Sequence, residues 1–398
     1  MANERDALIT GIGLVSCLGE GIEAHWSALT RQVGFQPVVD TTRFAPRSVH
    51  PVAPLELDRQ IPKRGDQRQM ELWQRIGTYA AGLALESAGV KGNTELLSRM
   101  DMIVAAGGGE RDYAVDAAIL SALPSAADPG RYLNEHLLSD LRPTLFLAQL
   151  SNLLAGNISI VHGVVGSSRT FMGEEAAATD AVRIACARIA ARQGELFLVG
   201  GSYNAERPDV LLIYELGGKL WKQPFRGVWS RQTQGGGVVP GSAGCFLVIE
   251  SRAHAMSRGA RALGHIAAIA TDRCRRNPGE ATRNASAQFA AMRRHVEPGA
   301  TAVISCASGV HDATEEEAAF LRGLGLPVRG LATALGHSME PSFPAGLAVA
   351  AMALNHARLF PPLEDSPMEA PMDGALRHVV VTSWGHWRGE AMAVIEPA

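Results

Sequence analysis

The sequence of 398 residues has few of the features that mark specialised protein classes. Aromatic residues make up only 6% of it, and no C-x-x-C pair occurs. The odd number of cysteines argues against a disulfide framework, and their spacing argues against a zinc site. The cysteines are Cys17, Cys186, Cys245, Cys274 and Cys306. The sequence alone therefore predicts free thiols, with no bound metal and no cofactor.

An excess of one charge and long apolar runs are also lacking. Lysine and arginine number 37 against 40 aspartates and glutamates, so the formal charge of −3 offers no basic surface for nucleic acid. The longest apolar helical run, "AGLAVAAMAL", is too short to span a bilayer. The start, "MANERDALITGIGLV", places charges before a very short apolar run. We therefore predict a cytoplasmic protein with no nucleic-acid partner and no membrane span.

What the sequence does contain is an alternation of short Val/Ile/Leu runs with longer helical patterns. This alternation predicts βα units and an α/β fold with a largely parallel, buried sheet. Expected strands begin near residues 7, 101, 195, 243, 265, 301 and 377, and expected helices span 21–30, 69–89, 144–155, 174–192, 283–297, 313–323 and 345–357. A strand-rich stretch around 244–272 divides the chain into two similar halves, 1–250 and 251–398.

The stretch "AGNISIVHGVVGSSRTFMGEEAAATDAVRI", residues 155–184, has the pattern of a strand and glycine turn that lead into a helix. Such an arrangement presents a nucleophile at the start of a helix, yet no nucleophile follows the turn. Glycine-rich segments elsewhere, such as "AAGGGERD", lack the G-x-G-x-x-G spacing of a dinucleotide site. Neither a G-x-S-x-G elbow nor an H-E-x-x-H helix occurs.

Six segments in succession carry a resemblance to a known family. They are "DALITGIGLVSCLGEGIEAHWSAL", "LAQLSNLLAGNISIVHGVVG", "ELFLVGGS", "GSAGCFLVIESRAHAMSRGA", "ALGHS" and "VVVTSWG". In order and spacing the chain resembles the β-ketoacyl-acyl-carrier-protein synthases of type II. The resemblance implies a thiolase-like αβαβα fold of five layers, built from two βαβαβαββ halves. It also implies a dimer and an acyl carrier protein as partner.

The same resemblance implies where the active-site residues lie. That family uses a cysteine at a helix N-terminus, where the helix dipole and an imidazole favour the thiolate, together with two histidines. Counting forward from Gly166 and back from Gly200 puts Glu175 at the position of the nucleophile. Cys306 falls at the first histidine position, and His337 retains the second. The resemblance therefore indicates a degenerate active site.

The segment "GHWRG" corresponds to the flexible glycine-rich gate of the family. His386 stands at the position of the gating phenylalanine, and Trp387 and Arg388 replace two glycines. Because glycine gives a loop its freedom, we expect a bulkier and stiffer gate, with His386 and Trp387 in contact with the substrate.

Glu175 has two interpretations. A carboxylate is stabilised at a helix N-terminus, so Glu175 could be a cap that fills the former thiol pocket. Alternatively it could stand in for the acylated cysteine, as glutamine does in related decarboxylating synthases and chain-length factors. Glutamine is neutral, whereas a buried glutamate must be protonated or paired.

The function implied is that of a chain-length-factor-like subunit, which pairs with a catalytically complete paralogue or with itself. The segment "GSSRTFMGEE" is similar to the second synthase of bacterial clusters that make very long acyl chains for lipid A. Two alternatives are a malonyl-carrier-protein decarboxylase that uses His337, and a homodimeric protein that binds acyl groups or the carrier. The dimer edge is expected at a strand around "NISIVHG", residues 157–163, with Ile160 in the seam.

Overall fold

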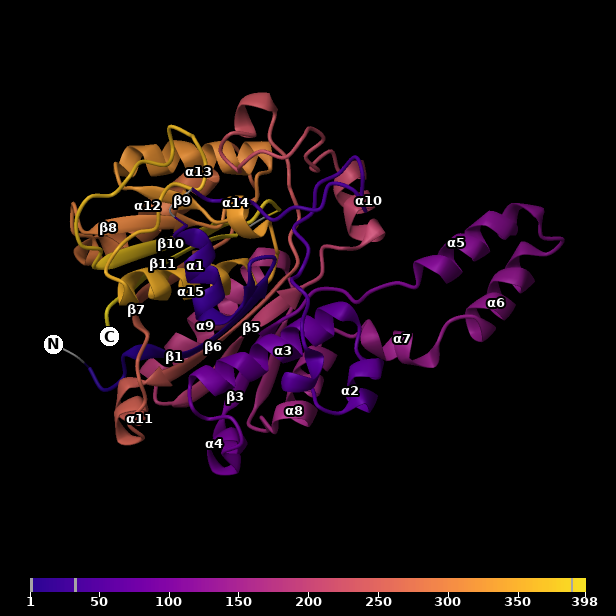
Figure 1. Cartoon of the computed structure of the whole chain (residues 1–398), viewed down its shortest axis with the longest axis horizontal. Helices are drawn as coiled ribbons and strands as arrows, with labels where there is room; N and C mark the ends of the chain where they lie inside the picture. The colour runs from indigo at the N-terminus through magenta and orange to yellow at the C-terminus, as the bar shows by residue number, and fades with distance from the viewer. Residues whose placement is uncertain (1–2, 32–33, 388) are drawn as a thin grey trace.

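The fold is organised around one continuous path of hydrogen-bonded strands. A computed structural model describes residues 3–31, 34–387 and 389–398 (Figure 1). The strand order along the path is β4-β3-β5-β6-β1-β7-β11-β10-β8-β9, and the short β2 (Gly19–Glu20) pairs with β1. The strands of the first half are β1 (Ala7–Ser16), β3 (Asp101–Ala105), β4 (Ser168–Phe171), β5 (Leu196–Tyr203) and β6 (Ala243–Ser251). Those of the second half are β7 (Gly264–Asp272), β8 (Thr301–Ser305), β9 (Val328–Gly330), β10 (His378–Trp384) and β11 (Glu390–Glu396).

The two halves repeat one topology. In each half the second strand lies between the third and the fourth and is parallel to both, while the last strand runs antiparallel to its neighbours. The halves meet where β1 pairs with β7 over three residues, from Ala7↔Ile266 to Ile9↔Gly264. The sheet is therefore mixed, which corrects the expectation of a largely parallel one. Antiparallel strands occupy its centre because each half ends in a strand that turns back toward the first.

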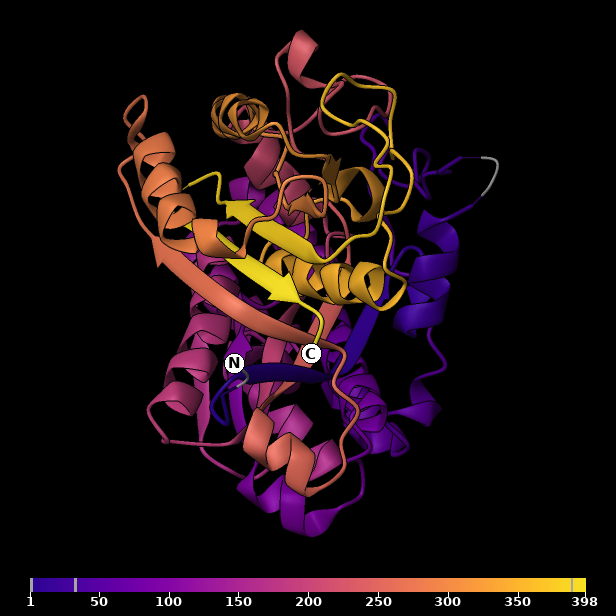
Figure 2. The ribbon, with the colours of Figure 1, turned by 90° about the vertical axis from the view of Figure 1, so that its left-hand side faces the viewer.

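Helices form three layers around these strands. The central helices α9 (Glu174–Ala190) and α15 (Ser342–Asn355) pack on each other between the halves, and Figure 2 shows α15 against the yellow strands β10 and β11. Helices α3 (Leu72–Ser87) and α8 (Leu153–His162) cover the outer face of the first half. Helices α12 (Glu280–Met292) and α13 (His311–Leu324) cover that of the second. The expected five-layered αβαβα arrangement is confirmed.

Close packing explains one of the glycines of β1. A Cβ atom on Gly13 would lie 1.9 Å from the carbonyl oxygen of Ala80 in α3. Only glycine lets the helix approach the strand this closely. The outer helix is therefore held tightly against the sheet that carries the site.

An arm projects from the body in Figure 1. It consists of α5 (Tyr113–Ala122), the 3₁₀ turn Leu123–Ser125 and α6 (Pro129–Ser139). In these three elements only Ile119 is buried. The arm therefore gains little stability from burial within its own chain.

The remaining helices are short and connect these layers. They are α1 (Gly21–Leu29), α2 (Arg64–Gln69), α4 (Thr94–Arg99), α7 (Pro143–Ala148), α10 (Pro208–Leu216), α11 (Arg252–Ser257) and α14 (Ala332–Leu335). Across the described ranges, every helix is too short or too polar to cross a membrane.

The α/β class and the seven expected strands are confirmed, but residues 157–163 are not a strand. They form the last turns of α8 and its C-terminal Gly163, which has a φ of 76°. Leu154 and Ile158 face the core four residues apart, which is helical spacing, whereas Ile160 is 70% exposed. The β-branched residues favoured a strand locally, but packing against α3 selects a helix. The edge strand is instead β4, which the sequence did not predict.

Candidate functional site

The start of α9 presents a carboxylate to the interior. Between β4 and α9 the chain turns at Gly173 (φ 134°) and Glu174 (φ 56°), a backbone region that residues other than glycine seldom adopt. This turn places Glu175 in the first turn of the helix, where it is 2% exposed. The positive end of the helix dipole favours a negative charge there.

Two histidines from distant segments meet Glu175. Nε2 of His337, which follows α14, lies 2.9 Å from Oε1 of Glu175. Nδ1 of His386, in the loop between β10 and β11, lies 2.8 Å from the same oxygen, and its backbone N–H also donates to it at 3.3 Å. All three side chains are buried. The structure therefore joins three of the residues that the sequence singled out.

The electrostatics of this cluster favour an ionised carboxylate. Burial alone would raise the pKa of Glu175, but His386 and then His337 outweigh it and hold that pKa well below its ordinary value. Burial lowers the pKa of His337, which Glu175 partly offsets. Nε2 of His337 lies at ion-pair distance from Glu175, but within the described part of the chain no aligned hydrogen bond reaches either ring nitrogen of His337. The contact is therefore electrostatic and is not a hydrogen bond.

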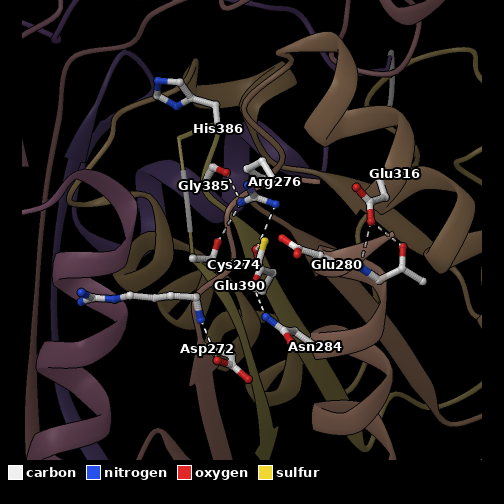
Figure 3. Close-up of polar contacts among 12 residues, drawn as sticks. Asp272, Cys274, Arg276, Glu280, Asn284, Glu316, Gly385, His386 and Glu390 are labelled. Atoms are coloured by element: carbon white, nitrogen blue, oxygen red, sulfur yellow. Dashed lines mark hydrogen bonds and ion pairs between the residues drawn. The ribbon is translucent and has the colours of Figure 1, made fainter. Parts of the chain in front are cut away.

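The loop that carries His386 is braced by Arg276. The backbone N–H of Gly385 donates to the carbonyl oxygen of Gly389 at 2.9 Å and closes the loop. Figure 3 shows the Arg276 guanidinium directed at Gly385, with His386 turned away from it. Nη2 of Arg276 donates to the carbonyl oxygens of Gly385 and Gly389, and Nη1 lies 3.0 Å from Oε1 of Glu390. The loop is therefore held at both ends from outside.

Trp387 covers this loop on the solvent side. Its indole lies 4.9 Å from the His386 ring, and the Lys219 ammonium lies 5.0 Å from its centroid. Trp387 is 45% exposed and lines a neighbouring cavity. Arg388, which the sequence also placed in the gate, lies outside the described residues. The stiff gate expected from the sequence stays a prediction, and the contacts of Arg276 and Trp387 are those that would restrict the loop.

Cys306 lies near the cluster but outside it. Its Sγ donates to the carbonyl oxygen of Ser342 at 3.3 Å, and burial raises the pKa of its thiol. Cys306 and His337 together line a cavity of about 10 Å³, roughly the space of one water molecule. A buried thiol with a raised pKa is a poor nucleophile, so the structure gives Cys306 no activated role.

A larger cavity of about 610 Å³ opens beside the turn before α9. Its wall includes Met172, Tyr214, Met339 and Trp387, which are apolar or aromatic, and also the carboxyl group of Glu340. Burial raises the pKa of Glu340 to about 7, and the nearby charge of Glu175 adds to the effect. Sequence reasoning missed Glu340 and Arg276. The unusual length of "GHSMEPSFPAG" could have pointed to Glu340, whereas nothing local marks Arg276.

Comparison with known proteins identifies similarity to synthases that extend acyl chains. The family described as "Beta-ketoacyl synthase, N-terminal domain" matches residues 4–255. The 3-oxoacyl-[acyl-carrier-protein] synthase 2 of Vibrio cholerae serotype O1 is 24% identical over 267 residues, which are 65% of this chain and 61% of that protein. The matched part thus spans less than two thirds of that relative.

Solved structures resemble the whole chain. The ishigamide ketosynthase/chain length factor superposes with a TM-score of 0.79 at 20% identity over 99% of both chains. A complex described as a type II PKS acyl-carrier protein with its ketosynthase bound to the hexaketide gives a TM-score of 0.71 at 16% identity, again over 99% of both chains. At these identities the likeness shows the fold.

Proposed function

This chain belongs to the beta-ketoacyl synthase family, and from that premise we propose that it is a non-condensing subunit similar to chain-length factors. It pairs with a catalytically complete synthase or with a second copy of itself in acyl-chain elongation on an acyl carrier protein. The observation that carries this proposal is the buried Glu175 cluster. At the helix start that presents a nucleophile in condensing relatives, this chain has a carboxylate engaged by two imidazoles.

The chemistry of the cluster supports a non-condensing role. Condensation needs a thiolate that attacks a thioester and leaves again with the acyl chain attached. A carboxylate of low pKa is a much weaker nucleophile, and Oε1 of Glu175 is already in contact with His337 and His386. Cys306, at the inferred position of the first histidine, cannot supply an imidazole. The chain thus lacks two of the three groups that condensation requires.

The relatives supply the partners of the proposal. One solved neighbour is a ketosynthase/chain length factor, and another is a ketosynthase in complex with its acyl-carrier protein. In such a pair the cavity beside the turn before α9 would contribute apolar wall to the space that receives the growing chain. Its polar groups, such as Glu340, would then influence how far that chain can extend.

The decarboxylase alternative receives less support. A surrogate for the acylated cysteine has to be neutral, as glutamine is, whereas the two histidines hold the pKa of Glu175 well below its ordinary value. An ionised carboxylate that is already in contact with two imidazoles is a poor mimic of a neutral acylated cysteine. We therefore propose the role of a non-condensing subunit in preference to that of a decarboxylase.

Co-expression with a synthase that has its cysteine tests the proposal. We expect a stable one-to-one complex by native mass spectrometry, and a change in product chain length when this chain is left out. Alone, it should form no acyl adduct with an acyl-loaded carrier. The Glu175→Cys variant should not condense either, because one missing acid–base group typically costs about 10²–10⁴-fold. Condensation by the isolated chain, or an acyl adduct on Cys306 or Cys186, would refute the proposal.

A further inference from the structure

The Glu175 cluster has the composition of a metal centre. A carboxylate oxygen of Glu175 and one ring nitrogen each from His337 and His386 all lie within 4.8 Å of one another, and all three residues are buried. Imidazole and carboxylate are ligands that bind Zn²⁺ and its neighbours in the first transition row. The three ligands come from α9, from the segment after α14 and from the β10–β11 loop. A local sequence motif therefore could not predict the site.

The distances within the cluster suit ligands of one ion. Two donors that each lie about 2.1 Å from one ion are about 3 Å apart at the right angles of a five- or six-coordinate ion, and about 3.4 Å apart at the tetrahedral angle. The separations of 2.9 Å and 2.8 Å from Oε1 of Glu175 have the first of these sizes. In such a site each lone pair points at the ion and not at the neighbouring donor. His337 behaves this way, since its Nε2 is close to Oε1 without an aligned hydrogen bond.

Several buried polar atoms of the cluster lack hydrogen-bond partners within the described ranges, which also supports a bound ion. Among the residues that the structure describes, no hydrogen-bond partner is found for buried Oε2 of Glu175, for either ring nitrogen of His337 or for Nε2 of His386. A buried polar atom without a partner costs about 1–3 kcal/mol, and in native proteins it calls for an ion or a water. Hydrogen bonding within the cluster serves only the His386–Glu175 pair. A cation would engage Nε2 of His337 as well and would neutralise the carboxylate.

We propose that Glu175, His337 and His386 bind one divalent transition-metal ion, and we choose Zn²⁺ as its probe. Two imidazoles and one carboxylate disfavour Mg²⁺ and Ca²⁺, which prefer oxygen ligands. Solvent molecules would complete the shell around the three protein ligands. The proposal does not depend on the partner assigned above, because the ligands all belong to this chain.

The brace on the gate loop prepares one ligand for this role. Arg276 fixes the two ends of the loop through the carbonyl oxygens of Gly385 and Gly389, and Figure 3 shows His386 extending from the braced loop. Metal ligands bind best when the surrounding contacts already hold their orientation. An ion that joins His386 to α9 would in turn hold the gate in place. The β10–β11 loop, which corresponds to a mobile gate in the family, would here be fixed because His386 coordinates the ion.

Titration of the chelator-treated protein with Zn²⁺ tests the proposal. We expect one ion per chain by isothermal titration calorimetry and by elemental analysis, with a midpoint of thermal unfolding that rises with the free Zn²⁺ concentration. The Glu175→Gln and His337→Gln variants should each bind at least about 100-fold more weakly, more than the loss of an outer contact would cost. Wild-type protein that takes up no stoichiometric Zn²⁺ would overturn the proposal.

Two matched controls separate this site from other ligands. His311→Gln removes an exposed histidine at the start of α13, and Cys306→Ser removes the thiol beside His337; both should bind Zn²⁺ as the wild type does. Because His337 and Glu175 are buried, their variants could misfold, so Co²⁺-substituted wild type provides a readout without mutation. Its absorption spectrum should lack a thiolate charge-transfer band. Such a band, or loss of binding in Cys306→Ser, would contradict the proposed ligands.

Discussion

The two ends of the strand path occupy equivalent places in the two halves, yet they differ in how they are covered. β9 closes the second half, and its three residues are all buried. β4 closes the first half, and its Ser168 and Arg169 are exposed. An uncovered edge offers backbone donors and acceptors to another chain, whereas a covered edge does not. The fold therefore covers one end of the sheet with its own chain and leaves the other end exposed.

The cover on β9 comes from the segment that follows α15. The backbone N–H of Gly330 donates to Oε1 of Glu369 at 2.7 Å, and that of Leu363 donates to Oε2 of the same carboxyl group. Arg329 donates from Nη1 to the carbonyl oxygen of Ala370 at 3.0 Å. These contacts occupy the edge with the protein's own chain.

Among the described strands, β4 pairs with β3 alone. The carbonyl oxygens of Ser167 and Phe171 accept from backbone N–H groups of Met102 and Ala106. In a parallel pair the alternate residues point the other way, so the backbone groups of Ser168 and Thr170 face outward. Exposed apolar side chains lie close to this strand in the sequence: Ile160, Val165 and Met172. The interface between chains stays a prediction, and the structure moves its expected place from residues 157–163 to the edge strand β4.

The largest effect is expected from Thr170→Pro. Proline removes an outward N–H group and leaves the hydrogen bonds to β3 intact, so the isolated chain should still fold. An interface of this obligate kind buries about 2,000 Å² or more, and loss of its central strand pairing should convert the assembly to monomers. Light scattering measures the mass. Thr170→Val, which keeps the N–H group, is the control, and an unchanged mass in Thr170→Pro would exclude β4 as the seam.

At the covered edge we expect a loss of stability instead of a loss of partner. Glu369→Ala leaves the buried N–H groups of Gly330 and Leu363 without acceptors, which should lower the free energy of unfolding by about 2–4 kcal/mol. Urea denaturation measures this, and size-exclusion chromatography should show an unchanged assembly. If Glu369→Ala dissociated without a loss of stability, β9 and not β4 would be the edge that binds a partner.

The cover on β9 should also depend on pH. Burial raises the pKa of Glu369 from 4.5 to about 7, although the amides of Gly330 and Leu363 offset part of the effect. The folded protein therefore keeps a proton on Glu369 that the unfolded chain has lost. The stability this provides is complete below pH 4.5 and is lost as the pH rises through 7. The midpoint temperature of thermal unfolding should decrease as the pH is raised from about 5 to about 8, and it should decrease less in Glu369→Gln than in the wild type. An equal decrease in both proteins would contradict this prediction.

The smallest effect is expected from Ile160→Asp. Ile160 lies on the exposed face of α8, so the charge should weaken assembly by about 1–2 kcal/mol only if the partner reaches that face. The stability of the isolated chain should change by less than about 0.5 kcal/mol. Analytical ultracentrifugation across a concentration series separates the two quantities. Complete dissociation of the Ile160→Asp variant would show that Ile160 lies at the centre of the interface.

Local pattern was sufficient for the strands of the core and insufficient for the edge. Long Val/Ile/Leu runs such as those of β6 and β10 are buried on both faces, so burial and sequence agree. β4 reads Ser-Arg-Thr-Phe, a polar tetrapeptide that only its hydrogen bonds to β3 identify as a strand. The same limitation led to the misassignment of 157–163, where β-branched residues lie in a helix.

The three residues of the cluster could be selected from the sequence one by one, but their arrangement could not. Counting along the family pattern selected Glu175, His337 and His386, and the structure places them together. Glu175 and His386 are 211 residues apart, so no spacing indicates that their side chains share an oxygen. Arg276 had no signal at all, because its role depends on the carbonyl groups of a loop more than 100 residues away.

The projecting arm has a consequence for the life of the molecule in a cell. Leu120 and Leu138 are 68% and 77% exposed on α5 and α6, and Ile119 is the only buried residue of those two helices. An unassembled copy thus presents a projecting helical pair with exposed leucines to proteases and chaperones. If assembly covers that pair, a copy without a partner is degraded sooner than one that has found it. Turnover would then keep this subunit in step with the supply of the other, with no dedicated regulator.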